Sequence, residues 1–154
     1  MISELLKRGG VWYNLDASTP QEAIRKASEV VCARLYPGVI DKDESELAGA
    51  ALEREGQSST AVGEGLAFPH ARAPFLRNRE AAFMALFYPR FPILWAAPDG
   101  LPVRAFFLIA SASPAEHLSS LSSLAKRCSN PEFARLLAGK ATQDQLLSLL
   151  GRVS

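Results

Sequence analysis

Apolar residues recur along this chain in two patterns, one typical of helices and one typical of buried strands. In the first pattern they lie three and four positions apart, as on one face of a helix. This pattern predicts helices that begin near Thr19, Asp43, Pro114, Asn130 and Thr142.

Residues typical of helix caps mark several of these boundaries. Thr19, Pro20 and Glu22 have the spacing of a capping box, in which two side chains satisfy backbone N–H groups of the first turn. The segment "TQDQ" repeats that spacing before the last leucine-rich stretch. Gly56 is a typical helix stop, so the second helix, from Asp43 to Gly56, would carry Arg54 in its last turn.

Short continuous apolar runs form the second pattern and predict strands that are covered on both faces. The runs are Ala81 to Tyr88, Ile93 to Ala96 and Val103 to Ala110. The last two flank "APDGLP", a strong turn signal, and we expect them to form a hairpin. We expect "GGVWYNLDAST" to be a strand or extended arm, "GLAFPH" to be a short strand and "QSSTAVGEG" to be a polar loop.

Helical and strand patterns are interleaved without a strict order. This predicts a single α/β domain over residues 1–154, with a mixed β-sheet sandwiched by helices. A chain of 154 residues can bury one sizeable core. Its 48% apolar and 21% charged residues are typical of a globular protein.

Charge and composition exclude several classes of function. Lys+Arg 17 against Asp+Glu 16 leaves a net charge of +1, without the basic surface that nucleic-acid binding requires. No apolar run approaches the ~20 residues of a membrane span, and the N-terminus lacks the apolar core of a signal peptide. Cys32 and Cys128 are widely separated and are expected to be free thiols. We therefore expect a cytoplasmic protein without direct membrane insertion.

The segment "GEGLAFPHAR", residues 63–72, contains one of only two histidines in the chain. Neutral and protonated imidazole are both accessible near neutral pH. A neutral ring nitrogen is a nucleophile and, once phosphorylated, a good leaving group. His70 would therefore suit the acceptance and onward transfer of a phosphoryl group, provided that cations and hydrogen-bond donors surround it.

The neighbouring sequence offers candidates for each supporting role. Pro69 has a fixed φ and would stiffen the approach to His70. Arg54 and Arg72 could pair with phosphate oxygens, and His117, the other histidine, could donate a hydrogen bond if the fold brings it close. Hydroxyl groups and closely approaching backbone could come from Ser58, Ser59, Thr60, Gly63 and Gly65.

Each of these residues also has an ordinary structural interpretation. A histidine after proline is most often a turn residue or a satisfied buried imidazole, and Arg54 would suit the carbonyl end of a helix. No serine or cysteine has the context of a catalytic triad, so a small hydrolase with His70 as general base is disfavoured. Two histidines are too few for a convincing metal site, and no metal or other cofactor is expected.

As a composite, "LEREGQSSTAVGEGLAFPHAR", Leu52 to Arg72, resembles the active-site segment of the type-2 enzyme IIA domains. These belong to the fructose/mannitol and nitrogen-regulatory branch of the bacterial phosphoenolpyruvate-dependent phosphotransferase system. The match runs position by position through Arg54, Ser59, Thr60, Gly63, Gly65, Pro69 and His70. "PDGLPVRAFFLIAS" and "HLSSLSSLAKRCSNPEFARLL" extend the resemblance over nearly the whole chain.

The resemblance implies a phosphotransferase/anion-transport-like α/β fold and a specific activity. It implies that His70 accepts phosphate from the histidine-containing phosphocarrier protein, that His117 is the second active-site histidine and that Arg54 lies beside the phosphate. The acceptor would be a IIB protein or a regulatory target. Because no IIB domain or membrane segment is fused to the sequence, we favour the nitrogen-regulatory type over a sugar-transport subunit.

An alternative is a regulatory protein-binding module that does not pass phosphate on and whose partners are switched by phosphorylation of His70. Three departures from the family pattern bear on partner choice: Phe68, Ala71 and the proline- and aromatic-rich "FYPRFPILWAAP". A weak homo-oligomer is compatible with the sequence.

Overall fold

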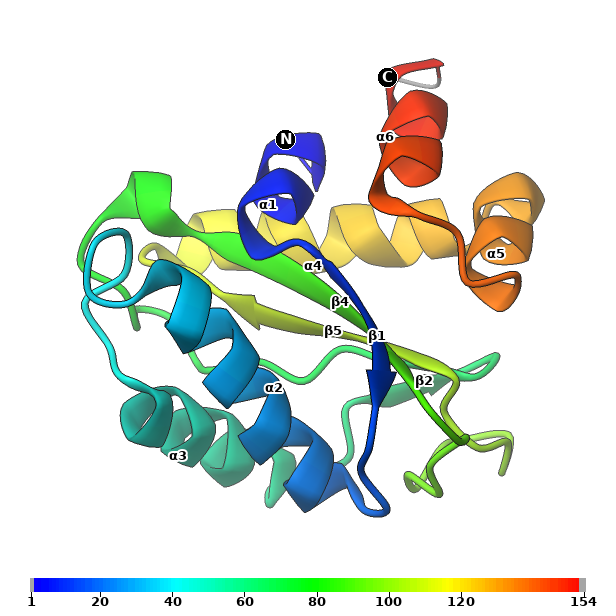
Figure 1. Cartoon of the computed structure of the whole chain (residues 1–154), viewed down its shortest axis with the longest axis horizontal. Coiled ribbons are helices and arrows are strands. Elements are labelled where there is room, and N and C mark those ends of the chain that lie inside the picture. The colour runs from blue at the N-terminus through cyan, green and yellow to red at the C-terminus, as the bar shows by residue number, and fades with distance from the viewer. Residues whose placement is uncertain (1, 153–154) are drawn as a thin grey trace.

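A five-stranded mixed sheet lies at the centre of the computed structural model, which describes residues 2–152 (Figure 1). Its strand order is β1-β4-β5-β3-β2. β1 pairs in parallel with β4 and β3 in parallel with β5, whereas the β4–β5 and β2–β3 pairs are antiparallel. The strands are β1 (Val11–Leu15), β2 (Ala61–Gly63), β3 (Leu66–Ala67), β4 (Phe83–Pro89) and β5 (Ala105–Ala110).

Helices cover both faces of this sheet. α2 and α3 lie on one face, and α1, α4, α5 and α6 lie on the other (Figure 1). The helices are α1 (Ile2–Gly9), α2 (Pro20–Leu35), α3 (Glu44–Glu55), α4 (Pro114–Cys128), α5 (Pro131–Ala138) and α6 (Gln143–Arg152), with a 3₁₀ turn at Arg79–Ala81. The prediction of a mixed sheet sandwiched by helices is confirmed. Across residues 2–152, none of the helices has the length and apolarity needed to cross a bilayer.

The central strands divide the core into two layers. Every residue of β4 and β5 is buried. Because strand side chains alternate between faces, Phe83 and Phe87 pack toward α2 and α3, whereas Met84 and Leu86 pack toward the other helices. Two of the three continuous apolar runs, Ala81 to Tyr88 and Val103 to Ala110, therefore contain strands covered on both faces, as predicted.

Local capping chemistry sets the helix starts as expected. The Thr19 side chain accepts from the Glu22 N–H, although the Glu22 carboxylate takes the Ser18 N–H rather than that of Thr19. Thr142 and Gln145 exchange the two hydrogen bonds of a capping box at the start of α6. Asp43 and Glu46 do the same at the start of α3, which places Arg54 in the last turn of that helix.

The predicted hairpin between Ile93–Ala96 and Val103–Ala110 is wrong. Ile93 and Val103 share one isolated bridge, while β5 begins at Ala105 and pairs along its length with β4. Prolines interrupt the segment between the two runs, and a proline cannot donate to a strand ladder. The apolar side chains of this segment therefore support an irregular loop.

One helix was not predicted, and one predicted loop contains a strand. Residues 2–9 form α1, whose buried Ile2, Leu5, Leu6 and Gly9 have helical spacing. The expected loop "QSSTAVGEG" contains β2 and the turn into β3. The buried face of α4 is formed by His117, Ser120 and Leu124.

Candidate functional site

The backbone around His70 is fixed against the neighbouring strand β5. The Pro69 carbonyl accepts from the Ile109 N–H at 3.1 Å, and the Ala71 N–H donates to the Ile109 carbonyl at 3.3 Å. His70 lies between these two bonds, just beyond the end of β3, and its side chain is half-buried. The proline before it needs no donor of its own, so this geometry leaves no backbone group of Pro69 unsatisfied.

One hydrogen bond decides the tautomer of the His70 ring. Its Nδ1 lies 2.8 Å from the carbonyl oxygen of Phe68. Because a carbonyl only accepts, Nδ1 must carry the proton, and the lone pair is then on Nε2. Burial holds the pKa of His70 below its ordinary value, and the charge of Arg54 acts in the same direction. The ring is therefore a neutral nucleophile near neutral pH.

The fold brings the second histidine against the first. The rings of His70 and His117 have centroids 5.0 Å apart and planes inclined by 55°. His117 is 8% exposed, and its Nδ1 lies 3.2 Å from the Ser111 hydroxyl. Burial, with the neighbouring His70, lowers the pKa of His117 to about 4. Within residues 2–152, the buried Nε2 of His117 has no hydrogen-bond partner, and a buried polar atom without one is costly.

A shallow depression of about 360 Å³ opens beside His70. Arg54 from the end of α3 lines it, with residues of the following loop and of α4. The Arg54 Nη1 donates to the Ser58 carbonyl at 2.8 Å, which fixes the side chain against the loop. The lining residues are Arg54, Ser59, Thr60, Ala61, Val62, Phe68, His70, Leu121, Ser122 and Ala125.

Two of the predicted hydroxyls lie in this depression with different partners. The Ser59 Oγ accepts from the Ala61 N–H at 3.1 Å and keeps its own proton for another acceptor. The Thr60 hydroxyl donates to the Glu55 carboxylate at 2.5 Å, so its single proton is already used. Ser58, the third hydroxyl, contacts the Arg54 guanidinium from outside the lining.

The other sequence candidates do not line the depression: His117 lies behind the His70 ring, and Gly63, Gly65 and Arg72 lie elsewhere. Gly63 and Gly65 adopt φ of 93° and 77° around the turn between β2 and β3, a region that suits residues without a side chain. A Cβ on Gly63 would approach the Asp99 carboxylate to 3.1 Å. Arg72 is exposed and donates to the side-chain oxygen of Gln57.

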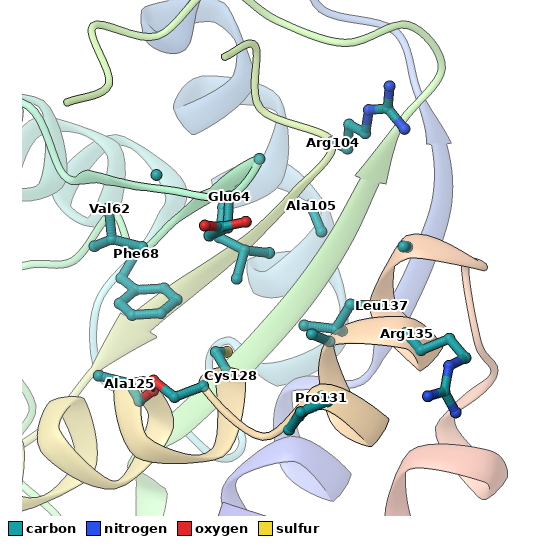
Figure 2. A pocket seen from close by; sticks show the side chains of 16 residues that line it. Val62, Glu64, Phe68, Arg104, Ala105, Ala125, Cys128, Pro131, Arg135 and Leu137 are labelled. Carbon is teal, nitrogen blue, oxygen red and sulfur yellow. Dashed lines mark hydrogen bonds between the residues drawn. The ribbon is translucent and has the colours of Figure 1, made fainter. Parts of the chain in front are cut away.

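A larger cavity of about 690 Å³ adjoins the depression, between the β2–β3 turn, β5, α4 and α5 (Figure 2). The two share Val62, Phe68 and Ala125 as walls. Gly63 and Gly65 line this larger cavity. Among residues 2–152, no group of three or more His, Cys, Asp or Glu side chains has the arrangement to hold a metal ion.

Residues 4–153 match the family described as "Phosphoenolpyruvate-dependent sugar phosphotransferase system, EIIA 2". The chain belongs to this family. The IIA domain is therefore a phosphoryl-transfer component of the phosphotransferase system, as the resemblance of Leu52 to Arg72 implied.

Curated relatives include both sugar-specific and regulatory proteins. The IIA domain is 28% identical over 153 residues to the fructose-specific EIIABC component of Bacillus subtilis, covering 98% of this chain and 23% of that protein. The chain thus spans about a quarter of the length of this relative. It is 30% identical over 154 residues to the nitrogen regulatory protein of Escherichia coli, covering 97% of this chain and 88% of that one.

Solved structures share the fold of this IIA domain. The nitrogen regulatory protein IIA-Ntr from Neisseria meningitidis superposes with a TM-score of 0.80 at 23% identity, over 97% of this chain and 98% of that one. Enzyme IIAMTL of Escherichia coli, in its complex with phosphorylated enzyme IIBMTL, gives a TM-score of 0.69 at 23% identity, over 93% and 94% of the two chains. A family member thus forms a complex with a phosphorylated IIB protein.

Sequence reasoning missed several residues around the site. Ser122 and Ala125 of α4 line the depression. Glu55 accepts hydrogen bonds from the Thr60 N–H and from the Trp95 indole, and so holds the loop after α3. The position of Glu55, next to Arg54 in the last helical turn, was the only signal available for it. No local signal connects Trp95 to this site.

Proposed function

We propose that His70 of this IIA domain accepts a phosphoryl group on Nε2 from the histidine-containing phosphocarrier protein. The observation that carries the proposal is the hydrogen bond from Nδ1 to the Phe68 carbonyl, which leaves the Nε2 lone pair free. That lone pair attacks phosphorus as the bond from phosphorus to the donor's imidazole breaks, and the electron pair stays with that imidazole. His70 keeps its Nδ1 proton throughout, so no base is required.

The neighbouring groups are suited to the charge of the phosphoryl oxygens. Arg54 supplies a positive charge in the same depression and has five N–H donors for bidentate contact. His117 would donate from Nε2 once the Ser111 hydroxyl donates to its Nδ1. Ser59 would add a hydroxyl donor, and Thr60 would shape the floor. Gly63, Gly65 and Arg72 are not part of this set. Gly63 and Gly65 form the turn between β2 and β3, and Arg72 contacts Gln57 in the loop after α3.

The phosphohistidine would then pass its phosphoryl group to a IIB protein or act as a regulatory signal. A bound phosphoryl group adds a charge of about −2 at the rim of the depression, enough to change which protein docks there. We favour the nitrogen-regulatory type, to which the 30% identical relative from Escherichia coli belongs. We place the activity in the cytoplasm, where free Cys32 and Cys128 are stable.

Labelling with phosphoenolpyruvate, enzyme I and the phosphocarrier protein tests the acceptor. The wild type and His117→Gln should both be labelled, the variant more slowly, whereas His70→Gln should take up no phosphate. Because the chain contains two histidines, this pair assigns the site directly. Equal labelling of His70→Gln and the wild type would reject the proposal. Adding a IIB protein to the labelled domain then separates onward transfer from a purely regulatory role.

A further inference from the structure

A continuous series of hydrogen bonds connects the reacting imidazole to the loop between β4 and β5. His70 Nδ1 donates to the Phe68 carbonyl at 2.8 Å, and the Phe68 N–H donates to the Thr60 carbonyl at 3.0 Å. The Thr60 N–H and hydroxyl both donate to the Glu55 carboxylate, at 2.9 and 2.5 Å. The series ends at Trp95, whose indole N–H donates to the same carboxylate at 2.9 Å.

Glu55 is the junction of this series. It accepts three hydrogen bonds, and none of them comes from its own helix. Bonds to a charged acceptor are among the stronger ones in proteins, and these are partly shielded from water. The carboxylate therefore fixes both the backbone and the side chain of Thr60.

The last turn of α3 holds the active loop from both sides. Arg54 donates to the Ser58 carbonyl, and Glu55 accepts from Thr60 two residues later. Arg54 and Glu55, two adjacent residues of opposite charge, thus fix the short segment from Ser58 to Thr60. The loop in turn sets the position of the Phe68 carbonyl, which orients His70.

The unusual "FYPRFPILWAAP" segment contributes Trp95, which binds the Glu55 carboxylate. Trp95 is 3% exposed, and its ring packs on Phe106 of β5 with centroids 5.5 Å apart. The sheet therefore holds the indole, and the indole holds the Glu55 carboxylate. The orientation of the Glu55 carboxylate is thus fixed by Trp95 on one side and by Thr60 on the other.

We propose that Glu55 is a positioning residue for phosphoryl transfer at His70, with Trp95 as the anchor of its carboxylate. This inference rests on the proposed function of His70. Glu55 does not contact the phosphoryl group; it acts through Thr60 and Phe68 on the tautomer and orientation of the ring. A misplacement of about 1 Å in such a site reduces the rate by ~10²-fold.

Four variants of the full chain test the proposal: Glu55→Ala, Glu55→Gln, Trp95→Phe and the matched control Glu53→Ala, an exposed carboxylate of the same helix. We expect Glu55→Ala to lower kcat for transfer from the phosphocarrier by ~10–100-fold with an unchanged KM. Glu55→Gln should recover most of that loss, because its amide oxygen still accepts from Thr60 and Trp95. Trp95→Phe should lose less than Glu55→Ala, and Glu53→Ala should equal the wild type.

¹⁵N NMR of the His70 ring and of the Trp95 indole reports on the same hydrogen bonds without a transfer reaction. In the wild type, the ring nitrogens of His70 should show the Nδ1–H tautomer, and Glu55→Ala should show a mixture of tautomers. The chain has two tryptophans, and the Trp12 indole donates to the Gly9 carbonyl, away from Glu55. Glu55→Ala should therefore shift the Trp95 indole resonance and leave that of Trp12 in place.

The outcomes separate this inference from the function on which it rests. Failure to label the wild type at His70 would reject the proposed function, while the NMR results would still report on the series. A labelled wild type with unchanged kcat and an unchanged His70 tautomer in Glu55→Ala would overturn the role of Glu55. Equal losses in Glu55→Ala and Glu53→Ala would also overturn it, since they would indicate a general charge effect.

Discussion

In the proposed transfer, His70 and Arg54 have different tasks in binding the phosphoryl group. The imidazole supplies the lone pair, because its Nδ1 proton is fixed on the Phe68 carbonyl. The guanidinium supplies charge and adds to the effect of burial, which lowers the pKa of His70 and keeps the ring neutral. The same positive charge thus favours the nucleophile before transfer and the phosphoryl oxygens after it.

Replacing the two candidate arginines one at a time should distinguish their roles. Arg54→Ala should slow transfer to His70 by ~10²-fold, because a preorganised charge beside the phosphoryl group is lost. Arg72→Ala should change the rate by less than ~3-fold, since Arg72 contacts Gln57 outside the depression. Single-turnover labelling gives both rates, and urea denaturation checks that both variants fold like the wild type. A wild-type rate for Arg54→Ala would leave Arg54 as a helix-end cation only.

At the scale of elements, the sequence predicted where helices begin and end, but not which strands pair. Thr19, Thr142 and Gly56 marked helix ends correctly, because caps depend on residues three or four positions away. The pairing of β5 with β4 depends on side chains packed from both faces, and turn signals alone suggested a different partner.

The site was predictable to a similar extent. Sequence spacing placed Arg54 and His70 together because a short helix end and a short strand end converge there. The bond from Trp95 to Glu55 joins residues 40 positions apart, and no periodicity encodes such a contact. Gly63 and Gly65 were interpreted as phosphate-binding residues, whereas the turn between β2 and β3 requires their positive φ values.

The close packing of α1 on β4 gives a test at this scale. A Cβ on Gly9 would lie 2.0 Å from the Met84 carbonyl oxygen, so Gly9→Ala must displace α1 or the strand. We expect a loss of about 3 kcal/mol in the free energy of unfolding, as for other overpacked sites. Gly49→Ala is the matched control, because the exposed Gly49 lies within α3 and a Cβ there meets nothing within 4 Å.

Gly49→Ala should stabilise the protein by about 0.5–1 kcal/mol, since alanine favours helix more than glycine does. Urea denaturation of the two variants beside the wild type measures both changes. Unfolding of Gly9→Ala at the wild-type urea concentration would show that α1 does not contribute to the cooperative core.

On the scale of the whole molecule, the sheet separates two apolar layers, and the two histidines lie where strand ends meet α4. Keeping both rings neutral would serve the proposed transfer, and it also couples folding to pH. The pKa of His117 is about 4 in the folded protein against an ordinary 6.5 when the chain is unfolded. Between these values the unfolded chain binds more protons than the folded one, so acid favours unfolding.

Acid removes the stability that depends on a neutral His117 ring. The stability at issue is fully present above about pH 6.5 and is lost as the pH falls toward 4. For His117 the loss between pH 7 and pH 5 should be about 1–2 kcal/mol, and the lowered pKa of His70 adds a loss of the same sign. His117→Leu should retain that 1–2 kcal/mol at pH 5 relative to its own value at pH 7.

Urea denaturation of wild type and His117→Leu at pH 7 and pH 5 gives the four free energies required. Comparing each protein with itself removes the packing cost of the substitution, and the carboxylates that also titrate in this range are common to both. An equal loss in the two proteins would mean that the buried His117 ring takes up its proton without cost. The second histidine would then be free to carry charge in the folded state, and its proposed role as a neutral donor to the phosphoryl group would fail with it.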